Sequence, residues 1–302
     1  MPAGTLQAVV RHEARTQATL GMQYWRLHKG SGMPSFLRAL KYCSTWALVL
    51  VAGSALAQKR ELVIGGIPEA PLRWQANDGQ FKGYDVEIID HIMKRLHIPY
   101  RIELVDSPAR LVRNSQAKPS PYDMVFSHSY THDRVEYLRY PGQSHVRFHW
   151  NFFLRKEDEG KFVFNRYSDL AGIPIGVTRG FAYSDEFLRA ITEVPLTVDV
   201  VATNKVQLDK LLAKRFDLVP LNTKSTLWEA RARGILPRIS YLPNPIKDRP
   251  YFNAFVKSSS YPRMADLIAR YDATLLEMKR DGSLTRIQAR YGFDKGPERP
   301  AP

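Results

Sequence analysis

Residues 61–105 read ELVIGGIPEAPLRWQANDGQFKGYDVEIIDHIMKRLHIPYRIELV, and our prediction of the fold begins with these residues. The segment opens with Glu61-Leu62-Val63-Ile64, a short run that is typical of a strand and ends in two glycines. Asp85 can cap the helix that follows. In that helix, apolar residues recur at helical spacing, namely at Val86, Ile89, Met93 and Leu96. Residues 100–105 then alternate as a second strand, so the segment predicts a βαβ unit.

The same alternation restarts in the second half of the chain. Strands are predicted at 123–126, 173–178, 196–202 and 217–221, and helices at 184–191, 206–216 and after residues 264 and 283. Two longer extended runs, at 148–154 and 251–257, separate the two halves of this pattern. We therefore expect an α/β fold of two βα lobes joined by two hinge crossings. Residues 58–149 plus 253–302 are predicted to form the first lobe, and residues 150–252 the second.

Composition narrows the class of protein. The chain has 302 residues, of which 44% are hydrophobic and 25% charged, and these values are near the globular average. They exclude a collagen, a wholly disordered chain and a polytopic membrane protein. A formal charge of +14 would by itself suggest nucleic acid or an anionic surface as a partner. The basic residues are scattered along the chain and form no stripe, which argues against nucleic acid.

Residues 33–57 have the three parts of a secretory signal peptide. Arg38 and Lys41 provide positive charge, a run of small and apolar residues follows, and Ala55-Leu56-Ala57 forms an A-x-A cleavage site. We therefore predict cleavage after Ala57 and a periplasmic mature protein. The alternative interpretation of the apolar run is a buried helix or a membrane anchor.

Removal of residues 1–57 would change both the charge and the cysteine content. Residues 1–32 lie upstream of the signal, so we predict that they are a non-native extension and that translation starts at Met33. The removed segment holds six basic residues and one acidic residue, which leaves 38 basic and 29 acidic residues and a net charge of +9. The only cysteine, Cys43, is removed as well, so we expect no disulfide or thiol chemistry in the mature protein.

The densest polar cluster is Ser127-His128-Ser129-Tyr130-Thr131-His132-Asp133-Arg134, directly after the predicted strand at 123–126. Hydroxyls and backbone amides at a strand end, followed by an arginine, suit a carboxylate, because arginine is a rigid two-pronged donor. Ligands of open α/β sheets bind beyond the carboxyl ends of strands, so a cleft between the lobes is the expected site. An ordinary helix N-cap with an exposed arginine explains the same residues equally well.

Four short motifs follow one another along the chain. They are Gly83-Tyr84-Asp85-Val86-Glu87, Ser127-x-Ser129-Tyr130-Thr131-x-x-Arg134, Asp169-Leu170-Ala171-Gly172-Ile173-Pro174-Ile175-Gly176-Val177 and Met278-Lys279-Arg280-Asp281-Gly282-Ser283-Leu284. In this order they resemble the bacterial extracellular solute-binding proteins of family 3, the amino-acid-binding type of ABC transporter receptor. The resemblance covers residues 60–292. It implies the type II fold of periplasmic binding proteins, with a small-molecule ligand held between two lobes.

The resemblance also implies roles for individual residues. Arg134 would hold the α-carboxylate of the ligand, assisted by Ser129 and Ser127. Thr178 and Gly180-Phe181-Ala182 would lie on the opposite lobe, where backbone amides near a helix start can also face the carboxylate.

Other candidate positions depart from the family or allow two interpretations. Asn222 stands where amino-acid receptors of this family usually have an acid that meets the ligand's ammonium, and Phe181 stands where they usually have Thr or Ser. A neutral amide cannot supply a full counter-charge to a buried ammonium. We therefore expect the ligand to be a modified amino acid, a different small carboxylate, or an amino acid whose ammonium meets Glu69. Trp74 either forms an aromatic wall of the site or is a partly buried packing residue.

We therefore expect a non-enzymatic, monomeric periplasmic protein that captures a small carboxylate ligand for an inner-membrane ABC permease and needs no cofactor. Histidines four residues apart, such as His128 and His132, fall in predicted loop or strand, so no metal site is predicted. One alternative is a periplasmic dehydratase resembling cyclohexadienyl dehydratase, with Glu69 either as general acid or as a solvated loop carboxylate. Another alternative is an orphan sensor that signals to a different membrane protein.

Overall fold

The strands and helix predicted at residues 61–105 form the centre of the first lobe. The computed structural model describes residues 60–293, and in it β1 (Leu62–Gly66) pairs in parallel with β4 (Tyr100–Leu104). The helix α3 (Tyr84–Leu96) lies between these strands in the chain, and β5 (Met124–Ser129) pairs in parallel with the other edge of β1. The predicted βαβ unit is thereby confirmed.

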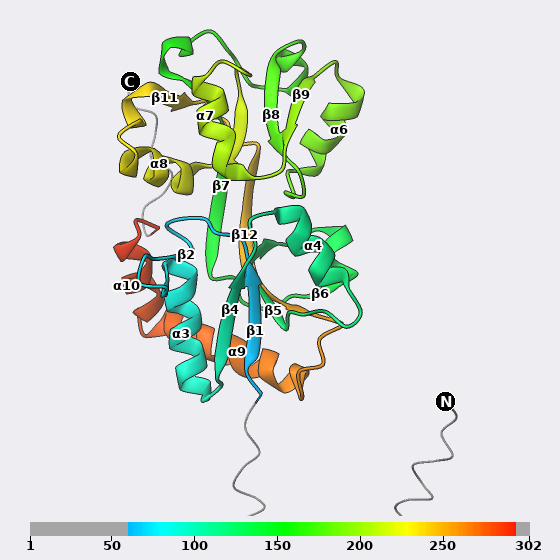
Figure 1. Ribbon diagram of the computed structural model, residues 1–302, viewed down its shortest axis with the longest axis vertical. Helices are drawn as coiled ribbons and strands as arrows, with labels where there is room; N and C mark the ends of the chain where they lie inside the picture. Colours follow the sequence, from blue (N-terminus) through cyan, green and yellow to red (C-terminus); the bar gives the residue numbers. More distant parts are fainter. Residues whose placement is uncertain (1–59, 294–302) are drawn as a thin grey trace, which may run out of the picture. The chain divides into compact units, whose positions relative to one another are not determined.

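Two ten-residue strands link this sheet to the second lobe (Figure 1). β7 (Val146–Arg155) and β12 (Lys247–Val256) run antiparallel and pair with each other. The rest of β12 pairs with β5, whereas the rest of β7 pairs with β10 (Val219–Asn222) and β11 (Ile239–Tyr241). The resulting path through the sheet has the order β10-β7-β12-β5-β1-β4, so one sheet passes through both lobes.

The second lobe also contains a parallel pair of strands, β8 (Pro174–Thr178) and β9 (Thr197–Val201). Its α-helices are α6 (Asp185–Glu193), α7 (Gln207–Leu212) and α8 (Thr223–Ala232). The other α-helices and strands of residues 60–293 are β2 (Trp74–Gln75), β3 (Phe81–Lys82), α4 (Pro108–Gln116), α5 (His132–Val135), β6 (Leu138–Arg139), α9 (Met264–Arg280) and α10 (Ser283–Arg290). Short 3₁₀ turns are η1 (Lys156–Asp158), η2 (Tyr167–Leu170), η3 (Asn204–Val206) and η4 (Leu236–Arg238).

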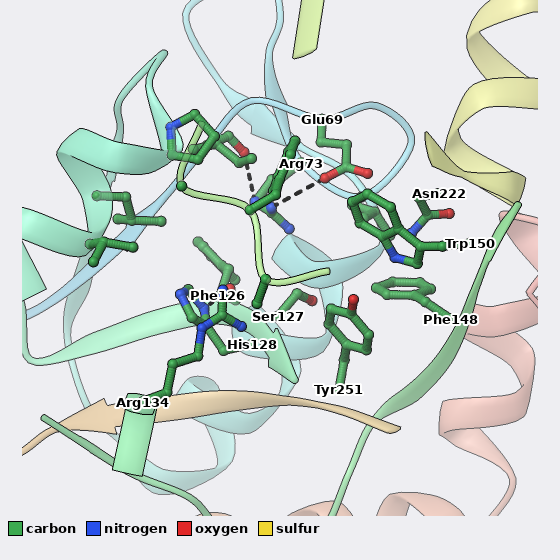
Figure 2. A pocket seen from close by; sticks show the side chains of 18 residues that line it. Glu69, Arg73, Phe126, Ser127, His128, Arg134, Phe148, Trp150, Asn222 and Tyr251 are labelled. Atoms are coloured by element: carbon green, nitrogen blue, oxygen red, sulfur yellow. Dashed lines mark hydrogen bonds and ion pairs between the residues drawn. The ribbon is translucent and has the colours of Figure 1, made fainter. Parts of the chain in front are cut away.

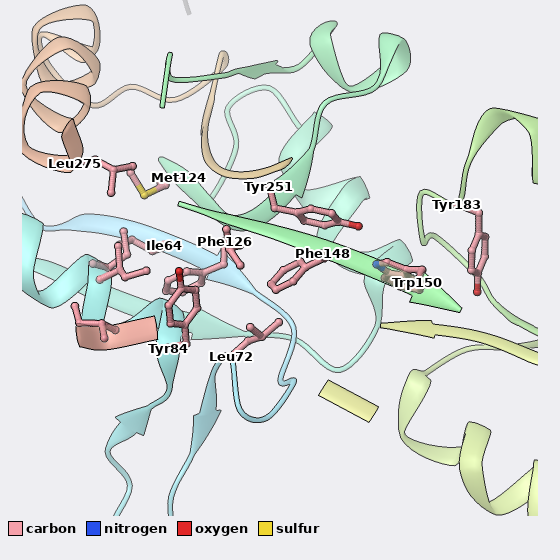
Figure 3. Packing of buried hydrophobic residues seen from close by; sticks show 14 of the residues in the cluster. Ile64, Leu72, Tyr84, Met124, Phe126, Phe148, Trp150, Tyr183, Tyr251 and Leu275 are labelled. Atoms are coloured by element: carbon pink, nitrogen blue, oxygen red, sulfur yellow. The ribbon is translucent and has the colours of Figure 1, made fainter. Parts of the chain in front are cut away.

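One apolar core extends along the crossing strands from the first lobe into the second (Figure 3). Phe148 and Trp150 of β7 continue this core towards Tyr183 of the second lobe. The ring of Phe148 packs edge-on against Tyr251 at 4.8 Å between centroids, and Trp150 packs edge-on against Tyr183 at 5.9 Å. Aromatic pairs in this geometry contribute about 0.5–1.5 kcal/mol beyond the burial of their area. The lobes therefore meet over apolar surface, and polar groups at this junction lie in surroundings of low polarity.

Asp85 does not cap α3, which corrects the sequence prediction. The N-cap residue is Gly83, whose φ of 128° and close approach to the carbonyl of Leu72 require a residue without Cβ. The Asp85 carboxylate is buried and accepts hydrogen bonds from Arg73 Nη1 at 2.5 Å and from Ser127 Oγ at 2.8 Å. Because these buried partners occupy the carboxylate, it does not bind the free amides of the first helical turn.

Two helices of the second lobe differ from the sequence prediction. The helix predicted at 206–216 ends at Leu212, because Lys214 has a φ of 59°, a left-handed conformation that stops an α-helix. The sequence does not predict α8, since its residues lack a clear apolar period. Its start is instead fixed by Asn222, whose side chain accepts a hydrogen bond from the backbone amide of Ser225 at 3.2 Å.

The predicted extension at 1–32, the predicted signal peptide at 33–57 and its cleavage site at Ala57 lie outside the described residues. Residues 60–293 belong to one compact unit, and the exact lobe limits near residues 150 and 253 remain a prediction. Within residues 60–293, none of the helices has the length and apolar character needed to cross a membrane.

Candidate functional site

A narrow cavity lies at the junction of the lobes, beyond the carboxyl end of β5 (Figure 2). From the first lobe it is lined by the loop after β1 and by the end of β5, and from the crossings by side chains of β7 and β12. The second lobe contributes the loop after β8 and the N-cap of α8. The cavity has a volume of about 50 Å³, which is enough for a few water molecules. Its position matches the place where open α/β sheets bind ligands.

Arg134 reaches the cavity from the short helix α5. Its side chain is directed inward, and the residue is only 8% exposed. Nη1 donates to the carbonyl and to the hydroxyl oxygen of Ser129, both at 3.3 Å. Thr131, the N-cap residue of α5, makes no side-chain cap bond. The structure therefore shows a buried arginine with N–H donors beyond those that Ser129 accepts, in place of a helix cap followed by an exposed arginine.

Lys247 is a second buried cation beside Arg134, and sequence reasoning missed it. It is the first residue of β12 and is 6% exposed. Nζ donates to Ser129 Oγ at 2.9 Å and to the carbonyl oxygen of Ala182 in the second lobe, and it lies 5.3 Å from the ring centroid of Tyr251. Burial and the charge of Arg134 lower the pKa of Lys247 to about 7. Lys247 thus connects the end of β5 with the loop after β8.

Arg73 lies at another part of the cavity wall, and sequence reasoning missed it as well. Its guanidinium donates to the carbonyl of Ile67 at 2.7 Å and to Asp85 at 2.5 Å, and it lies 3.7 Å from the carboxylate of Glu69. Burial opposes the ionisation of Asp85, but the hydrogen bond from His145 and the charge of Arg73 together hold the pKa of Asp85 below its ordinary value. Arg73 therefore already has counter-charges within the protein.

Ser127 lines the cavity, but its hydroxyl is bound within the protein. Oγ donates to Asp85 at 2.8 Å and lies 3.1 Å from His145 Nε2. The backbone of Ser127 has a φ of 47°, which is uncommon for a serine, and its amide donates to the side chain of Asn253 at 3.1 Å. These bonds hold the strained conformation, so Ser127 orients the buried Asp85 as well as forming part of the wall.

The loop after β8 brings the second lobe against the first. Gly180 has a φ of 84°, and a Cβ at this position would lie 2.5 Å from the backbone nitrogen of Ala109 in α4. A glycine is therefore required for this close approach. The next side chain, Phe181, packs edge-on against Trp150 with 5.4 Å between ring centroids. Gly180, Phe181 and Ala182 all line the cavity, as does Trp150.

Glu69 and Asn222 line the cavity on the side away from Arg134 (Figure 2). The Asn222 side chain is occupied as the cap of α8 through its bond from the amide of Ser225. Burial raises the pKa of Glu69, and the nearby charge of Arg73 offsets this only in part. At this side of the cavity, Asn222 thus provides an amide, and Glu69 provides a carboxyl group with a raised pKa.

His128 contributes no positive charge to the cavity it lines. Burial, followed by the charge of Arg134, lowers the pKa of His128 well below its ordinary value, so the ring is neutral at neutral pH. Its Nδ1 lies 2.8 Å from the carbonyl oxygen of Phe126. In the part of the chain between residues 60 and 293, no group of three His, Cys, Asp or Glu side chains is arranged to hold a metal ion.

Comparison with known proteins assigns the chain to a family. The sequence profile of bacterial extracellular solute-binding proteins, family 3, matches residues 62–295. The chain belongs to this family. A comparison with curated proteins gives no match.

Solved structures similar to this family 3 protein support the fold. An arginine 3rd transport system periplasmic binding protein from Legionella pneumophila is 20% identical, with a TM-score of 0.61, and the match covers 76% of this chain and 99% of that one. A histidine kinase sensor domain with similarity to periplasmic binding proteins is 18% identical, with a TM-score of 0.63 and coverage of 78% and 96%. An ancestral amino-acid-binding protein, a precursor of cyclohexadienyl dehydratase, is 13% identical, with a TM-score of 0.63 and coverage of 82% and 99%. The predicted two-lobed periplasmic binding protein fold is confirmed.

The structure brings most of the predicted site residues of this family 3 protein to the cavity. Those that line it are Glu69, Ser127, Arg134, Gly180, Phe181, Ala182 and Asn222. Ser129 lies behind Arg134 and accepts its hydrogen bonds. Thr178 is buried, and its hydroxyl accepts from Gln207 at 2.8 Å. Trp74 lines a neighbouring hollow of about 530 Å³ and packs against Trp228 at 5.9 Å between ring centroids. The binding roles of all these residues stay predictions.

Proposed function

We propose that this protein is a periplasmic solute-binding protein that captures a small carboxylate ligand, an amino acid or a related compound. It acts as a monomer without cofactor or metal, presents the ligand to an inner-membrane ABC permease and leaves it chemically unchanged. One observation carries the proposal. Arg134 is buried against the cavity, and within residues 60–293 no ion pair joins it to a carboxylate. Because a buried charge without a counter-charge is costly, a ligand carboxylate at Arg134 would be strongly favoured.

Capture requires the lobes to move, because the cavity of about 50 Å³ is too small to admit an amino acid as it stands. The ligand enters while the lobes are apart, and Arg134 of the first lobe holds its carboxylate through paired N–H donors. The second lobe then closes by bending at the crossing strands β7 and β12. Closure brings residues 180–182 over the ligand and excludes water, which strengthens the ion pair.

Replacement of Arg134 tests this proposal. The exported protein, predicted to begin at Gln58, is screened by thermal shift against amino acids and small organic acids, since a ligand at a hundred times its Kd stabilises by about 2.7 kcal/mol. Titration calorimetry then measures the compounds that bind. We expect Arg134→Ala to weaken binding by about a hundred-fold or more, because one partner of a buried ion pair is lost. Arg139, which is exposed in the same lobe, provides the control Arg139→Ala with unchanged affinity. Equal affinities of Arg134→Ala and the wild type would refute the assigned site.

Glu69 supports a second candidate function, a dehydratase on the same fold. Its carboxyl group lines the cavity, and burial raises its pKa, as a general acid requires. Incubation with prephenate or arogenate separates the two functions, because a receptor returns the compound unchanged whereas a dehydratase forms product. Product formation that is lost in Glu69→Gln would establish the enzyme.

An orphan sensor would use the same site as the receptor, and permease and ATPase genes beside this one would favour transport.

A further inference from the structure

Two buried cations share one hydroxyl group beside the cavity: Arg134 lines the cavity, whereas Lys247 and Ser129 lie next to Arg134 outside the set of lining residues. Ser129 Oγ lies 2.9 Å from Lys247 Nζ and 3.3 Å from Arg134 Nη1. Lys247 is 6% exposed and Arg134 is 8% exposed. Both donate to neutral oxygens, and in the described residues 60–293 no ion pair joins either of them to a carboxylate. Two like charges are thus held side by side without a counter-charge in contact.

The other ionisable groups of the cavity do not compensate for this charge. Arg73 and Asp85 form an ion pair of 2.5 Å and cancel each other. His128 is neutral, because burial and the charge of Arg134 lower its pKa well below the ordinary value. Glu69 is the one remaining carboxylate among the residues that line the cavity in the described chain. Asp133 and Asp185 favour the protonated form of Lys247, but within residues 60–293 neither forms an ion pair with it. As long as Lys247 holds its proton, this edge therefore keeps positive charge that no carboxylate contacts, even when Glu69 is ionised.

We infer that Lys247 and Arg134 form a two-cation site that selects ligands with a net negative charge. The ligand class is then a small molecule with two acidic groups, or a carboxylate without an ammonium, in place of a neutral or cationic amino acid. The inference rests on the proposed function, because it concerns the ligand of that same site. It sets this chain apart from the similar Legionella pneumophila protein, which is named for arginine, a cationic ligand.

The electrostatic reason lies in the apolar surroundings of the two cations. Phe148, Trp150 and Phe181 line the same cavity, so charges within it are poorly screened. An additional ammonium would increase the positive excess, and Asn222 offers no negative charge to meet it. A second carboxylate would instead accept a charge-assisted hydrogen bond from Lys247, which at present bonds to neutral oxygens.

Binding of an anion to this site also moves a proton. Arg134 and Arg249 face Lys247 and disfavour its protonated form, whereas Asp185 and Asp133 favour it. The ring of Tyr251 packs on the ammonium. Burial and Arg134 leave the pKa of Lys247 at about 7, so above that pH the group is mostly neutral before binding. A bound anion favours the protonated form, and the complex therefore takes up a proton at alkaline pH, with affinity falling as pH rises.

Titration calorimetry with ligands that differ by one charge tests the inference. The purified protein is titrated at pH 6.5 with glutamate and glutamine, with aspartate and asparagine, and with succinate and its monoamide, and arginine serves as the cationic probe. Lys247→Met removes the charge at nearly constant length, whereas Lys247→Arg keeps it. Lys257, an exposed lysine just beyond β12, provides the control Lys257→Met. Thermal midpoints establish that each variant is folded.

We expect one acid to bind about ten-fold more tightly than its amide, because a charge-assisted hydrogen bond replaces a neutral one. Arginine should bind more weakly than either. The preference should disappear in Lys247→Met and persist in Lys247→Arg and Lys257→Met. An amide or arginine that binds as tightly as the acid would overturn the inference and leave the proposed function standing, and so would an unchanged preference in Lys247→Met. If no compound of this set or of the wider screen binds, the proposed function itself fails.

Proton uptake gives a second readout that does not depend on the stability of a variant. At pH 8.5, titrations of the wild type in buffers with different ionisation enthalpies should show uptake of a proton on binding of the acid. Lys247→Arg should show none, because an arginine keeps its proton at this pH. Absence of uptake in the wild type would count against the role of Lys247.

Discussion

Two parts of the cavity wall each hold a buried arginine, yet among residues 60–293 only one of these arginines is paired with a carboxylate. Arg73 contacts Asp85 at 2.5 Å and lies 3.7 Å from Glu69. Arg134 bonds to neutral oxygens of Ser129 and has Lys247 as its neighbour. The charge of Arg73 is therefore already met by carboxylates of the protein, whereas Arg134 retains its capacity to bind an anion. Burial does not distinguish the two arginines, and we propose Arg134 as the binding arginine because it lacks the counter-charge that Arg73 has.

The largest effect on stability is expected when the paired cation loses its partner. Asp85→Asn leaves Arg73 buried with only the more distant Glu69 as counter-charge, so we expect a loss of about 3–5 kcal/mol in the free energy of unfolding. The matched control is Asp90→Asn in the same helix, where Asp90 forms a largely exposed ion pair of 2.7 Å with Lys94. That control should lose no more than about 1 kcal/mol. Urea unfolding of both variants makes the comparison, and equal losses would show that pairing at Arg73 is not structural.

An effect of opposite sign is expected when the unpaired cation Lys247 is removed. The pKa of Lys247 is about 7 in the folded protein against 10.5 as its ordinary value, so between these values the unfolded chain binds more protons. The stability of the wild type therefore rises with pH over this range, by at most about 1.4 kcal/mol per pH unit from this group. Lys247→Met has no ammonium to bury. Its gain in the free energy of unfolding over the wild type should therefore be greatest below pH 7 and shrink towards pH 10. Urea unfolding at pH 6, 8 and 9.5 measures the difference, and a constant difference would contradict the buried charge.

Local patterns explain why much of the fold could be predicted from the sequence. The strand, helix and strand of residues 61–105 each have a period that is visible within a few residues. The motif that ends in Arg134 is equally local, because the strand β5 and the helix α5 place its residues together. Such features depend on neighbours in the chain, and sequence reasoning can therefore find them.

The features that sequence reasoning missed depend on contacts between distant segments. No local pattern distinguishes Lys247 from the other basic residues, and its place beside Ser129 results from the pairing of β12 with β5. Asp85 has the position of a helix cap in the sequence, but Arg73 binds its carboxylate in the folded chain. The charge balance of the site is a property of such tertiary contacts, and the sequence alone does not reveal it.

A crystal structure of the protein with the tightest-binding acid of the panel is the most direct test of the central claim, that Arg134 is the unpaired cation that holds the ligand. We predict a ligand carboxylate bonded to the guanidinium of Arg134, with an acidic oxygen within hydrogen-bond reach of Lys247 Nζ. A ligand carboxylate held by Arg73, with Arg134 and Lys247 still bonded to Ser129 and Ala182 as they are now, would contradict it.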